Sequence, residues 1–370
     1  MSRTGRQLFT TLDASGSLTL TLEEVTVPDP TDSQVLVQME AAPINPSDLA
    51  ILTSAADFEA ATYSPGKVVA PLAEPYLTGS KTRHGRKLPV GNEGAGTVIA
   101  AGEHPMAQAL LGQRVACVPG NAFSEFALSP AHLCLPLGDH TAEQGASSFV
   151  NPMTALGFVE TAKAEGRSAL IHLAAASNLG QMLGRVCAED DIALVNIVRK
   201  PEHVELLRGQ GAKHVLNSSD EDFPEQLRAA VEATGAYLGF DPIGGGRMTD
   251  ACLRAMEQVA ASKMTEYSRY GSAEPKKMYV YGRLDFAPTI LTASYGLEWT
   301  VSGWLLTTFL RRAGMETVGR MRKRVLAGLG TTFSSNYKAT IGLEEMLTRD
   351  AILDYRQMKT GEKYLVAPQR

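Results

Sequence analysis

An alternation of short apolar runs with amphipathic stretches between residues 169 and 281 constrains the fold of this chain more than any other feature. The pattern predicts strands at 169–173, 192–198, 214–217, 237–240 and 277–281, and helices at 179–188, 202–210, 225–234 and 247–259. Strands and helices that alternate at this spacing are joined by right-handed crossovers and form a parallel sheet. We therefore predict an α/β protein with a doubly wound, nucleotide-binding domain.

The preceding part of the chain has a different pattern. It predicts short strands at 7–12, 17–22, 34–40, 97–101 and 114–118, with many turns and no helix of convincing length before Ala142. A chain of 370 residues has room for about two domains. The first ~145 residues are thus expected to form a β-rich domain of their own.

Composition excludes several classes of partner. The chain carries 35 Lys and Arg against 40 Asp and Glu, and this mild negative balance argues against a nucleic-acid-binding surface.

The four cysteines of the chain form no C-x-x-C pair, and its N-terminus lacks the apolar run of a secretory signal. The stretch 290–310 contains Glu298 and is interpreted as buried structure rather than a membrane span, with Trp299 and Trp304 in the core or a dimer interface. A cytoplasmic location is expected.

The turn after the first strand of the alternating region has the small residues that a dinucleotide needs. Ala174, Ala175 and Ala176 keep the turn narrow, and Gly180 takes the position of close helix–strand packing. Ser177 and Asn178 stand where paired glycines are usual, so a strict G-x-G-x-x-G is absent. We predict that Ser177, Asn178, Leu179, Gly180 and Gln181 contact the cofactor pyrophosphate at the start of the helix. An ordinary Ala-rich helix start is the alternative.

The end of the second strand indicates which cofactor is bound. NAD-binding domains carry an acidic residue there, which binds the ribose hydroxyls, whereas this chain has Arg199 and Lys200. Two cations suit a 2′-phosphate, so NADP is favoured. The alternative is that both are solvated surface charges.

Motifs along most of the chain resemble those of the medium-chain dehydrogenase/reductase superfamily, in its zinc-free quinone oxidoreductase branch. The matching segments occur in the family's order: Asn45-Pro-Ser-Asp48, Pro89-Val-Gly-Asn-Glu-Gly-Ala-Gly-Thr-Val98, Gly112-Gln-Arg-Val-Ala116, Ala122-Phe-Ser-Glu-Phe-Ala127, Pro152-Met-Thr-Ala155, Gly211-Ala212, Phe240-Asp241 and Thr360-Gly-Glu-Lys-Tyr-Leu-Val-Ala-Pro368. The resemblance implies a GroES-like catalytic domain formed by 1–146 and 311–370, and an NADP-binding Rossmann domain formed by 147–310. It also implies a cleft between them, where the nicotinamide meets the substrate, and a homodimer.

The resemblance also implies functional residues. Zinc-dependent members carry Cys and His where this chain has Asn45 and Asn92, so no catalytic metal is expected. Asn45 is expected to contact cofactor or substrate near the nicotinamide, unless it is an Asx-turn residue before Pro46. Thr154 is similar to a family threonine beside the nicotinamide, with a helix N-cap as the alternative. Asp241 and Gly282, at the ends of the fourth and fifth strands, complete the expected cofactor contacts.

The reaction implied is hydride transfer from NADPH to a quinone or an α,β-unsaturated carbonyl, which needs hydrogen bonds to a developing enolate rather than a metal. An enoyl-thioester (enoyl-CoA) reductase and a non-catalytic nucleotide-binding or structural protein of the same fold remain alternatives.

The segment between Asp48 and Pro89 is longer than the family's usual connection. It contains Tyr63 and Tyr76, either of which is a candidate proton donor, and the basic run 81–87, which suits an acidic substrate or coenzyme phosphates. Of the two tyrosines, Tyr63 is the favoured catalytic residue. A solvated surface insertion is the alternative.

Overall fold

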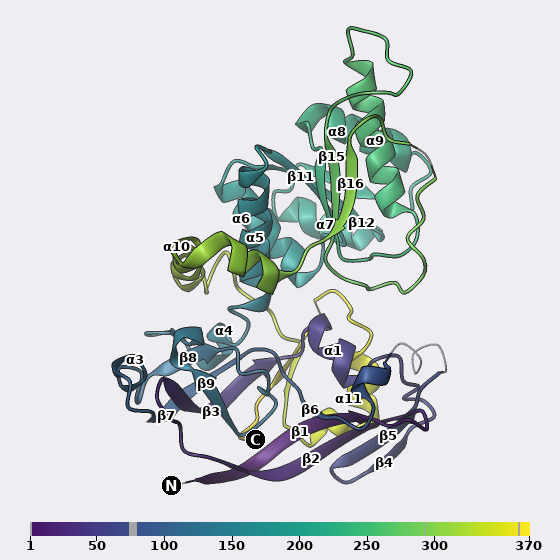
Figure 1. The fold of residues 1–370 in the computed structure, drawn as a ribbon. Helices are drawn as coiled ribbons and strands as arrows, with labels where there is room; N and C mark the ends of the chain where they lie inside the picture. The colour runs from purple at the N-terminus through teal and green to yellow at the C-terminus, as the bar shows by residue number, and fades with distance from the viewer. Residues whose placement is uncertain (1, 74–79, 293, 362) are drawn as a thin grey trace. The chain divides into compact units, whose positions relative to one another are not determined.

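The computed structural model describes residues 2–73, 80–292, 294–361 and 363–370 (Figure 1). The chain divides into two compact units, the first formed by residues 1–150 and 322–370 and the second by residues 151–321. The sequence had suggested divisions after residues 146 and 310. Each unit is described separately below.

One sheet of the first unit has the order β4-β5-β2-β1-β6. Its strands are β1 (Arg3–Leu12), β2 (Ser17–Val27), β4 (Thr62–Ser64), β5 (Lys67–Pro71) and β6 (Lys87–Pro89). Three of these come from the long segment between Asp48 and Pro89, and Phe58, Val68 and Ala70 of that segment are fully buried. The interpretation of this segment as a solvated surface insertion is therefore wrong for its described residues, because it forms part of the sheet and core.

Another sheet of this unit brings distant parts of the chain together. It contains β3 (Gln34–Pro43), β7 (Gly94–Ala101), β8 (Arg114–Cys117), β9 (Phe126–Pro130), β10 (Leu135–Pro136), β17 (Ala339–Ile341) and β18 (Tyr364–Val366). Strand β18 pairs antiparallel with β3, so that Leu365 lies opposite Pro43. The end of the chain thus completes the unit that the beginning starts, and it brings Lys363 close to the turn after β3.

The first unit also contains several short helices and 3-10 turns. They are α1 (Pro46–Leu52), α3 (Pro105–Gln108), α4 (Ala142–Gly145) and α11 (Arg349–Tyr355), with 3-10 turns η1 (Lys81–Arg83), η2 (Ala131–Leu133) and η3 (Glu345–Leu347). Helix α1 was not predicted, because seven residues are too few to show a helical period. Its local signals are Pro46 at the first helical position and Asp48 in the first turn, both of which favour a helix start.

The second unit contains a parallel sheet with the order β13-β12-β11-β14-β15-β16 in the described chain. The strands are β11 (Ala169–Leu173), β12 (Ala193–Val198), β13 (His214–Asn217), β14 (Leu238–Asp241), β15 (Lys276–Val280) and β16 (Trp299–Gly303). Five of them match the predicted strands to within a residue. Since the strand order reverses beside β11, this sheet has the topological switch point at which doubly wound folds bind ligands.

Helices cover both faces of this sheet (Figure 1). Helices α8 (Phe223–Thr234) and α9 (Met248–Ser262) pack together on one face, while α5 (Val150–Ala164) and α6 (Asn178–Glu189) lie on the other, and α7 (Pro201–Gly209) packs on β13. The apolar core under α8 and α9 includes Ile171, Leu227 and Met256. Helix α10 (Leu306–Ala327), which the sequence analysis did not identify, is interrupted at Gly314, where φ is +79°.

The stretch 290–310 is only partly buried, in contrast to the prediction from the sequence. Its β16 strand lies at the sheet edge, and Trp299 is 38% exposed, so this residue is not in the core of the unit. Trp304 is buried as predicted, and its indole N–H donates to the Thr161 hydroxyl at 3.1 Å. None of the helices that the structure describes combines the length and apolar character needed to cross a membrane.

Candidate active site

The turn between β11 and α6 is compact. Ala174 adopts a left-handed conformation with φ of +51°, and the Ala175 N–H donates to the Ile197 carbonyl on β12 at 3.1 Å. A Cβ atom at Gly180 would lie 2.2 Å from the Ala175 carbonyl oxygen. Only glycine therefore allows α6 to start this close to the turn.

The side chains at the start of α6 hold this turn. Ser177 is the N-cap of α6, and its hydroxyl accepts the Gly180 N–H at 3.1 Å. Gln181 donates to the Ala176 carbonyl and accepts from Gln210, each at 2.8 Å. The twelve-residue helix directs the positive end of its dipole at the turn, which is the arrangement that binds a pyrophosphate. The side chain of Gln181 is thus engaged in holding the turn. Asn178 and Leu179 form the first turn of the helix.

The two cations at the end of β12 are exposed. Lys200 lies 3.6 Å from Glu202, and the Ser219 hydroxyl donates to the Arg199 carbonyl at 3.0 Å. His203, in the first turn of α7, was not singled out from the sequence. Burial lowers its pKa, and the charges of Lys200 and Arg199 act in the same direction while Glu202 opposes them. Arg199 and Lys200 thus place two positive charges at the end of β12, and Glu202 partly offsets that of Lys200.

The other predicted cofactor residues have structural contacts of their own. Asp241 is buried at the end of β14, where its carboxylate accepts the N–H groups of Ile243 and Gly244 and the hydroxyl of Thr249. A Cβ atom at Gly282 would lie 2.7 Å from the Pro242 carbonyl oxygen, so this glycine permits a close crossing of two turns. Thr154 is buried in the second turn of α5, which begins at Val150, and the N-cap alternative is therefore wrong.

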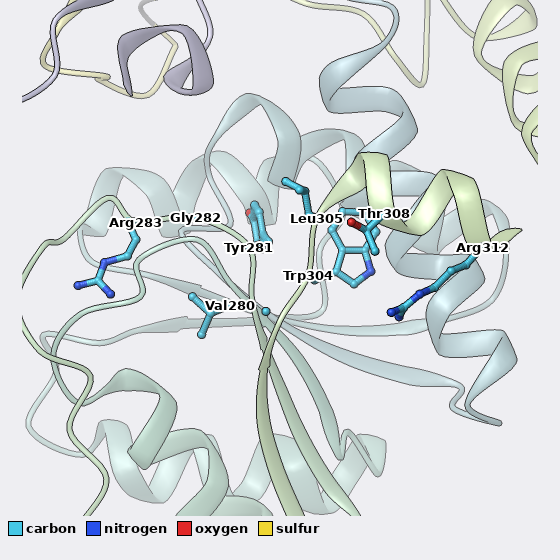
Figure 2. A pocket seen from close by; sticks show the side chains of 9 residues that line it. Val280, Tyr281, Gly282, Arg283, Trp304, Leu305, Thr308 and Arg312 are labelled. Atoms are coloured by element: carbon cyan, nitrogen blue, oxygen red, sulfur yellow. The ribbon is translucent and has the colours of Figure 1, made fainter. Parts of the chain in front are cut away.

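A pocket of about 560 Å³ lies beyond the ends of β15 and β16 (Figure 2). It is lined by backbone at Gly282 and Gly303, by the aromatic side chains of Tyr281 and Trp304, and by Val280, Arg283, Leu305, Thr308 and Arg312. Figure 2 shows Arg283 and Arg312 on opposite sides of this pocket. No carboxylate is among these described lining residues, so the pocket favours an anionic or neutral ligand.

Tyr281 lines this pocket and also contacts strand β11 of the parallel sheet. Its hydroxyl lies 2.8 Å from Nε2 of His172, a fully buried residue of β11. Burial lowers the pKa of His172 to about 3, so the imidazole is neutral at physiological pH. This pair was not predicted, because a single His in an apolar strand carries no distinctive sequence signal.

In the first unit, Asn45 lies at the turn between β3 and α1. Its backbone N–H donates to Asp48 Oδ2 at 2.9 Å, and the other Asp48 oxygen accepts the Asn92 N–H at 2.8 Å. Burial raises the pKa of Asp48 to about 7, although the two backbone N–H donors favour the carboxylate and act in the opposite direction. Asp48 therefore joins α1 to the 91–93 turn.

The Asn45 side chain contacts Glu93. Its Nδ2 donates to Glu93 Oε1 at 2.8 Å, and both residues are 1% exposed. The other Glu93 oxygen accepts the backbone N–H groups of Phe149 at 2.8 Å and Val150 at 3.0 Å. Asn45 is also the N-cap residue of α1 and forms a capping box with Asp48, so its buried Oδ1 faces the first turn of that helix. The contact between Asn45 and Glu93 was not predicted, because Glu93 is recognisable in the sequence only as part of a family motif.

Lys363 supplies the positive charge near these two carboxyl groups. Burial lowers its pKa to about 8, while the charges of Glu93 and Asp48 oppose the shift. Its ammonium donates to the Ser147 hydroxyl at 2.8 Å, which in turn lies 2.8 Å from the Tyr337 hydroxyl. Burial also raises the pKa of Glu93, but the charge of Lys363 and three N–H donors, which occupy both carboxyl oxygens, favour its ionised form.

The remaining candidates come from the long segment. The Tyr63 hydroxyl donates to the Phe58 carbonyl at 2.8 Å, and burial raises its pKa. Arg83 donates to Thr10, Ser54 and the Ile51 carbonyl, and Lys87 pairs with Glu23 at 2.8 Å. Two cations of the 81–87 run therefore stabilise the first unit. Tyr76 lies outside the described residues.

Comparisons with known proteins agree with this architecture. No protein-family model matches the chain. A protein from Mesorhizobium loti, proposed to be an NADPH:quinone reductase, has a crystal structure that matches with a TM-score of 0.74 and 26% identity, over 99% of this chain and 98% of that one. The chain is thus similar in sequence and fold to proteins of the medium-chain dehydrogenase/reductase superfamily. The family resemblance and the fold class predicted from the sequence are thereby confirmed.

Other reductases are also similar to this chain in sequence or in fold. The mitochondrial enoyl-[acyl-carrier-protein] reductase of Xenopus tropicalis is 28% identical over 243 residues, which span 62% of this chain and 61% of the frog enzyme. Prostaglandin reductase-3 of Mus musculus is 23% identical over 70% of this chain and 72% of its own. A mutant enoyl thioester reductase from Candida tropicalis has the same fold, with a TM-score of 0.69 and 18% identity over 99% of this chain and all of that one.

The described parts of the chain contain no group of three or more His, Cys, Asp or Glu side chains placed to hold a metal ion. That the reaction needs no metal stays a prediction.

Proposed function

We propose that this protein is an NADPH-dependent reductase that transfers hydride to a quinone or an α,β-unsaturated carbonyl. The observation that carries the proposal is the α6 turn beside the switch point, combined with the exposed cations of Arg199 and Lys200 at the end of the neighbouring strand. The relatives add support, since the Mesorhizobium loti protein is a proposed NADPH:quinone reductase and a mycobacterial neighbour was crystallised with NADPH.

The residues of the second unit fit this cofactor. The N-terminus of α6 would hold the pyrophosphate, because Gly180 lets the helix start directly against the narrow alanine turn. Arg199 and Lys200 would hold the 2′-phosphate, which NADH lacks. The side chains of Asp241, Gln181 and Ser177 act mainly by fixing the turns around the cofactor, because their hydrogen bonds are already made within those turns.

Bound NADPH would supply the hydride, and the protein would orient the substrate and complete the proton balance. We propose that Asn45 contacts the nicotinamide end and that Tyr63 donates the proton to the enolate. For that step the Tyr63 O–H must turn from the Phe58 carbonyl to the substrate. Thr154 is proposed to lie near the nicotinamide.

A second candidate is an enoyl-thioester reductase, favoured by the names of the frog and Candida tropicalis relatives. The pocket beyond β15 and β16 gives this candidate a physical basis, because Arg312 would meet the phosphates of a coenzyme thioester, whereas Arg283 already donates to the carbonyls of Phe286 and Ala287. The basic run 81–87 is less suited to that role, since Arg83 and Lys87 are already engaged.

The test is NADPH oxidation with three acceptors of matched reactivity: a quinone, a simple enone and an enoyl-CoA. The proposal predicts turnover of the quinone or the enone. In the thioester alternative, R312A raises KM for the enoyl-CoA at least about tenfold, the loss of one charge-assisted contact, and leaves KM for the enone unchanged. Tight NADPH binding without turnover of any acceptor would instead favour the non-catalytic alternative. The proposed homodimer is checked separately by light scattering.

A further inference from the structure

The two arginines that line the pocket beyond β15 and β16 differ in how they are held. Arg283 donates to the carbonyls of Phe286 and Ala287, which fixes its guanidinium on one side of the pocket. Arg312, on the opposite side, is exposed and makes no hydrogen bond or ion pair with any described residue (Figure 2). Since no carboxylate is among the described lining residues, the charge of Arg312 attracts an anion into the pocket.

Thr308 adds a hydroxyl group on the same side of the pocket. It precedes Arg312 by four residues in the part of α10 before Gly314, so the two side chains share one face of the helix. The Thr308 hydroxyl also has no hydrogen-bond partner in the described chain. A guanidinium fork beside a hydroxyl donor matches the two oxygens of a carboxylate.

The remaining wall of the pocket is apolar and held in place. The Trp304 indole N–H donates to the Thr161 hydroxyl at 3.1 Å, and the Tyr281 hydroxyl lies 2.8 Å from Nε2 of His172. The polar atoms of both aromatic side chains are thus engaged inside the protein, and exposed Leu305 lies beside them. These side chains offer a bound molecule a rigid apolar surface next to the donors of α10.

We propose that this pocket is a subsite for the carboxylate of the acceptor, so that the enzyme prefers α,β-unsaturated carbonyl compounds with an acid group on an apolar chain. Arg312, assisted by Thr308, is the specificity-determining residue. Every residue of the subsite belongs to the second unit. The inference rests on the proposed function, because it takes an α,β-unsaturated carbonyl compound as the acceptor.

The placement of the cations favours a carboxylate over the phosphates of a coenzyme. A coenzyme thioester carries several phosphate charges, which are best bound by donors that converge on them. Arg283 and Arg312 lie on opposite sides of the pocket and do not converge on one group (Figure 2). A carboxylate has a single charge, which the fork of Arg312 and the hydroxyl of Thr308 satisfy.

The test uses 7-oxooct-5-enoate and its methyl ester, whose double bonds are equally reactive because a saturated chain separates them from the acid group. With the full-length wild type and NADPH, kcat/KM should be at least about tenfold higher for the acid. R312A should lower kcat/KM for the acid about 10- to 100-fold and for the ester less than about threefold. R312K should retain part of the preference, since lysine keeps the charge without the planar fork. T308V should lower kcat/KM for the acid about 3- to 10-fold.

Arg311 provides a matched control in the same helix. It is exposed and has no hydrogen bond or ion pair in the described chain, but it does not line the pocket. R311A should therefore leave both acceptors unchanged. Calorimetric titration with 7-oxooctanoate, the saturated product, with and without NADP⁺, measures binding apart from turnover. Its affinity should fall in R312A as much as kcat/KM for the acid does, and should not fall in R311A.

Equal kcat/KM values for acid and ester in the wild type, or equal effects of R312A and R311A, would overturn the proposal. Weaker NADPH binding by R312A would also overturn it, because the pocket would then hold the cofactor. An effect of R312A confined to an enoyl-CoA would assign Arg312 to coenzyme phosphates and contradict the carboxylate role. If no acceptor is reduced while 7-oxooctanoate still binds through Arg312, the proposed function fails and the subsite stands.

Discussion

The close approach of α6 to the phosphate turn predicts that G180A damages both stability and cofactor binding. The new Cβ would lie 2.2 Å from the Ala175 oxygen, 2.6 Å from its carbonyl carbon and 2.8 Å from its Cα. These are backbone atoms, and the Ala175 N–H is itself bound to the Ile197 carbonyl, so the turn cannot yield easily. Ordinary contact needs 3.4 Å or more. The helix must therefore move by about 1 Å, at a cost of roughly 1–3 kcal/mol.

Gly184 provides a matched control in the same helix. A Cβ at Gly184 would meet no atom of the described chain within 4 Å. Because alanine is favoured over glycine in a helix interior, G184A should stabilise the protein by about 0.5–1 kcal/mol. The same chemical change is thus expected to have opposite effects at two positions of one helix.

The assay compares thermal unfolding and NADPH affinity for the two variants. G180A should lower the unfolding midpoint by roughly 2–10 °C and weaken NADPH at least about tenfold, since the helix start no longer reaches the pyrophosphate. G184A should raise the midpoint slightly and leave affinity unchanged. Equal behaviour of the two variants, or wild-type NADPH affinity in G180A, would refute the reasoning.

Two further predictions concern charge. Replacing Arg199 and Lys200 with alanine should weaken NADPH about 10- to 100-fold and NADH less than about threefold, with the difference shrinking at high salt; calorimetric titration measures this, and equal weakening of both would contradict a 2′-phosphate role. Burial lowers the pKa of His172 from 6.5 to about 3, so its contribution to stability is complete above pH 6.5 and is lost as the pH falls toward 3. Between about pH 6.5 and pH 5, His172 should lower the free energy of unfolding of the wild type by about 2 kcal/mol, and H172Q should lack this decrease. Denaturant unfolding measures it, and the same pH dependence in both proteins would show that His172 is not held neutral.

The parallel sheet could be predicted from the sequence because its strands are continuous apolar runs. Ala169–Leu173 is fully buried and was placed to the residue, since small and polar residues bound it on both sides. Strand β16 could not be predicted in the same way, because an edge strand is exposed on one side and its residues lack a clear period.

The candidate site was only partly predictable for a different reason. The α6 turn is local in sequence, so its small residues could be recognised from spacing alone. The contact between Asn45 and Glu93 spans 48 residues, and Lys363 joins it from the far end of the chain. Such a cluster depends on the pairing of β18 with β3, which no local pattern reveals. Tertiary structure also decides that Arg83 is a structural residue rather than a surface charge.

A crystal structure of the NADP⁺ complex tests the central claim most directly. The account predicts the pyrophosphate against the N-terminus of α6, at Asn178 to Gly180, and the 2′-phosphate within hydrogen-bond distance of Arg199 or Lys200. A pyrophosphate bound elsewhere, or crystals grown with saturating NADP⁺ that contain none at this turn, would contradict the account.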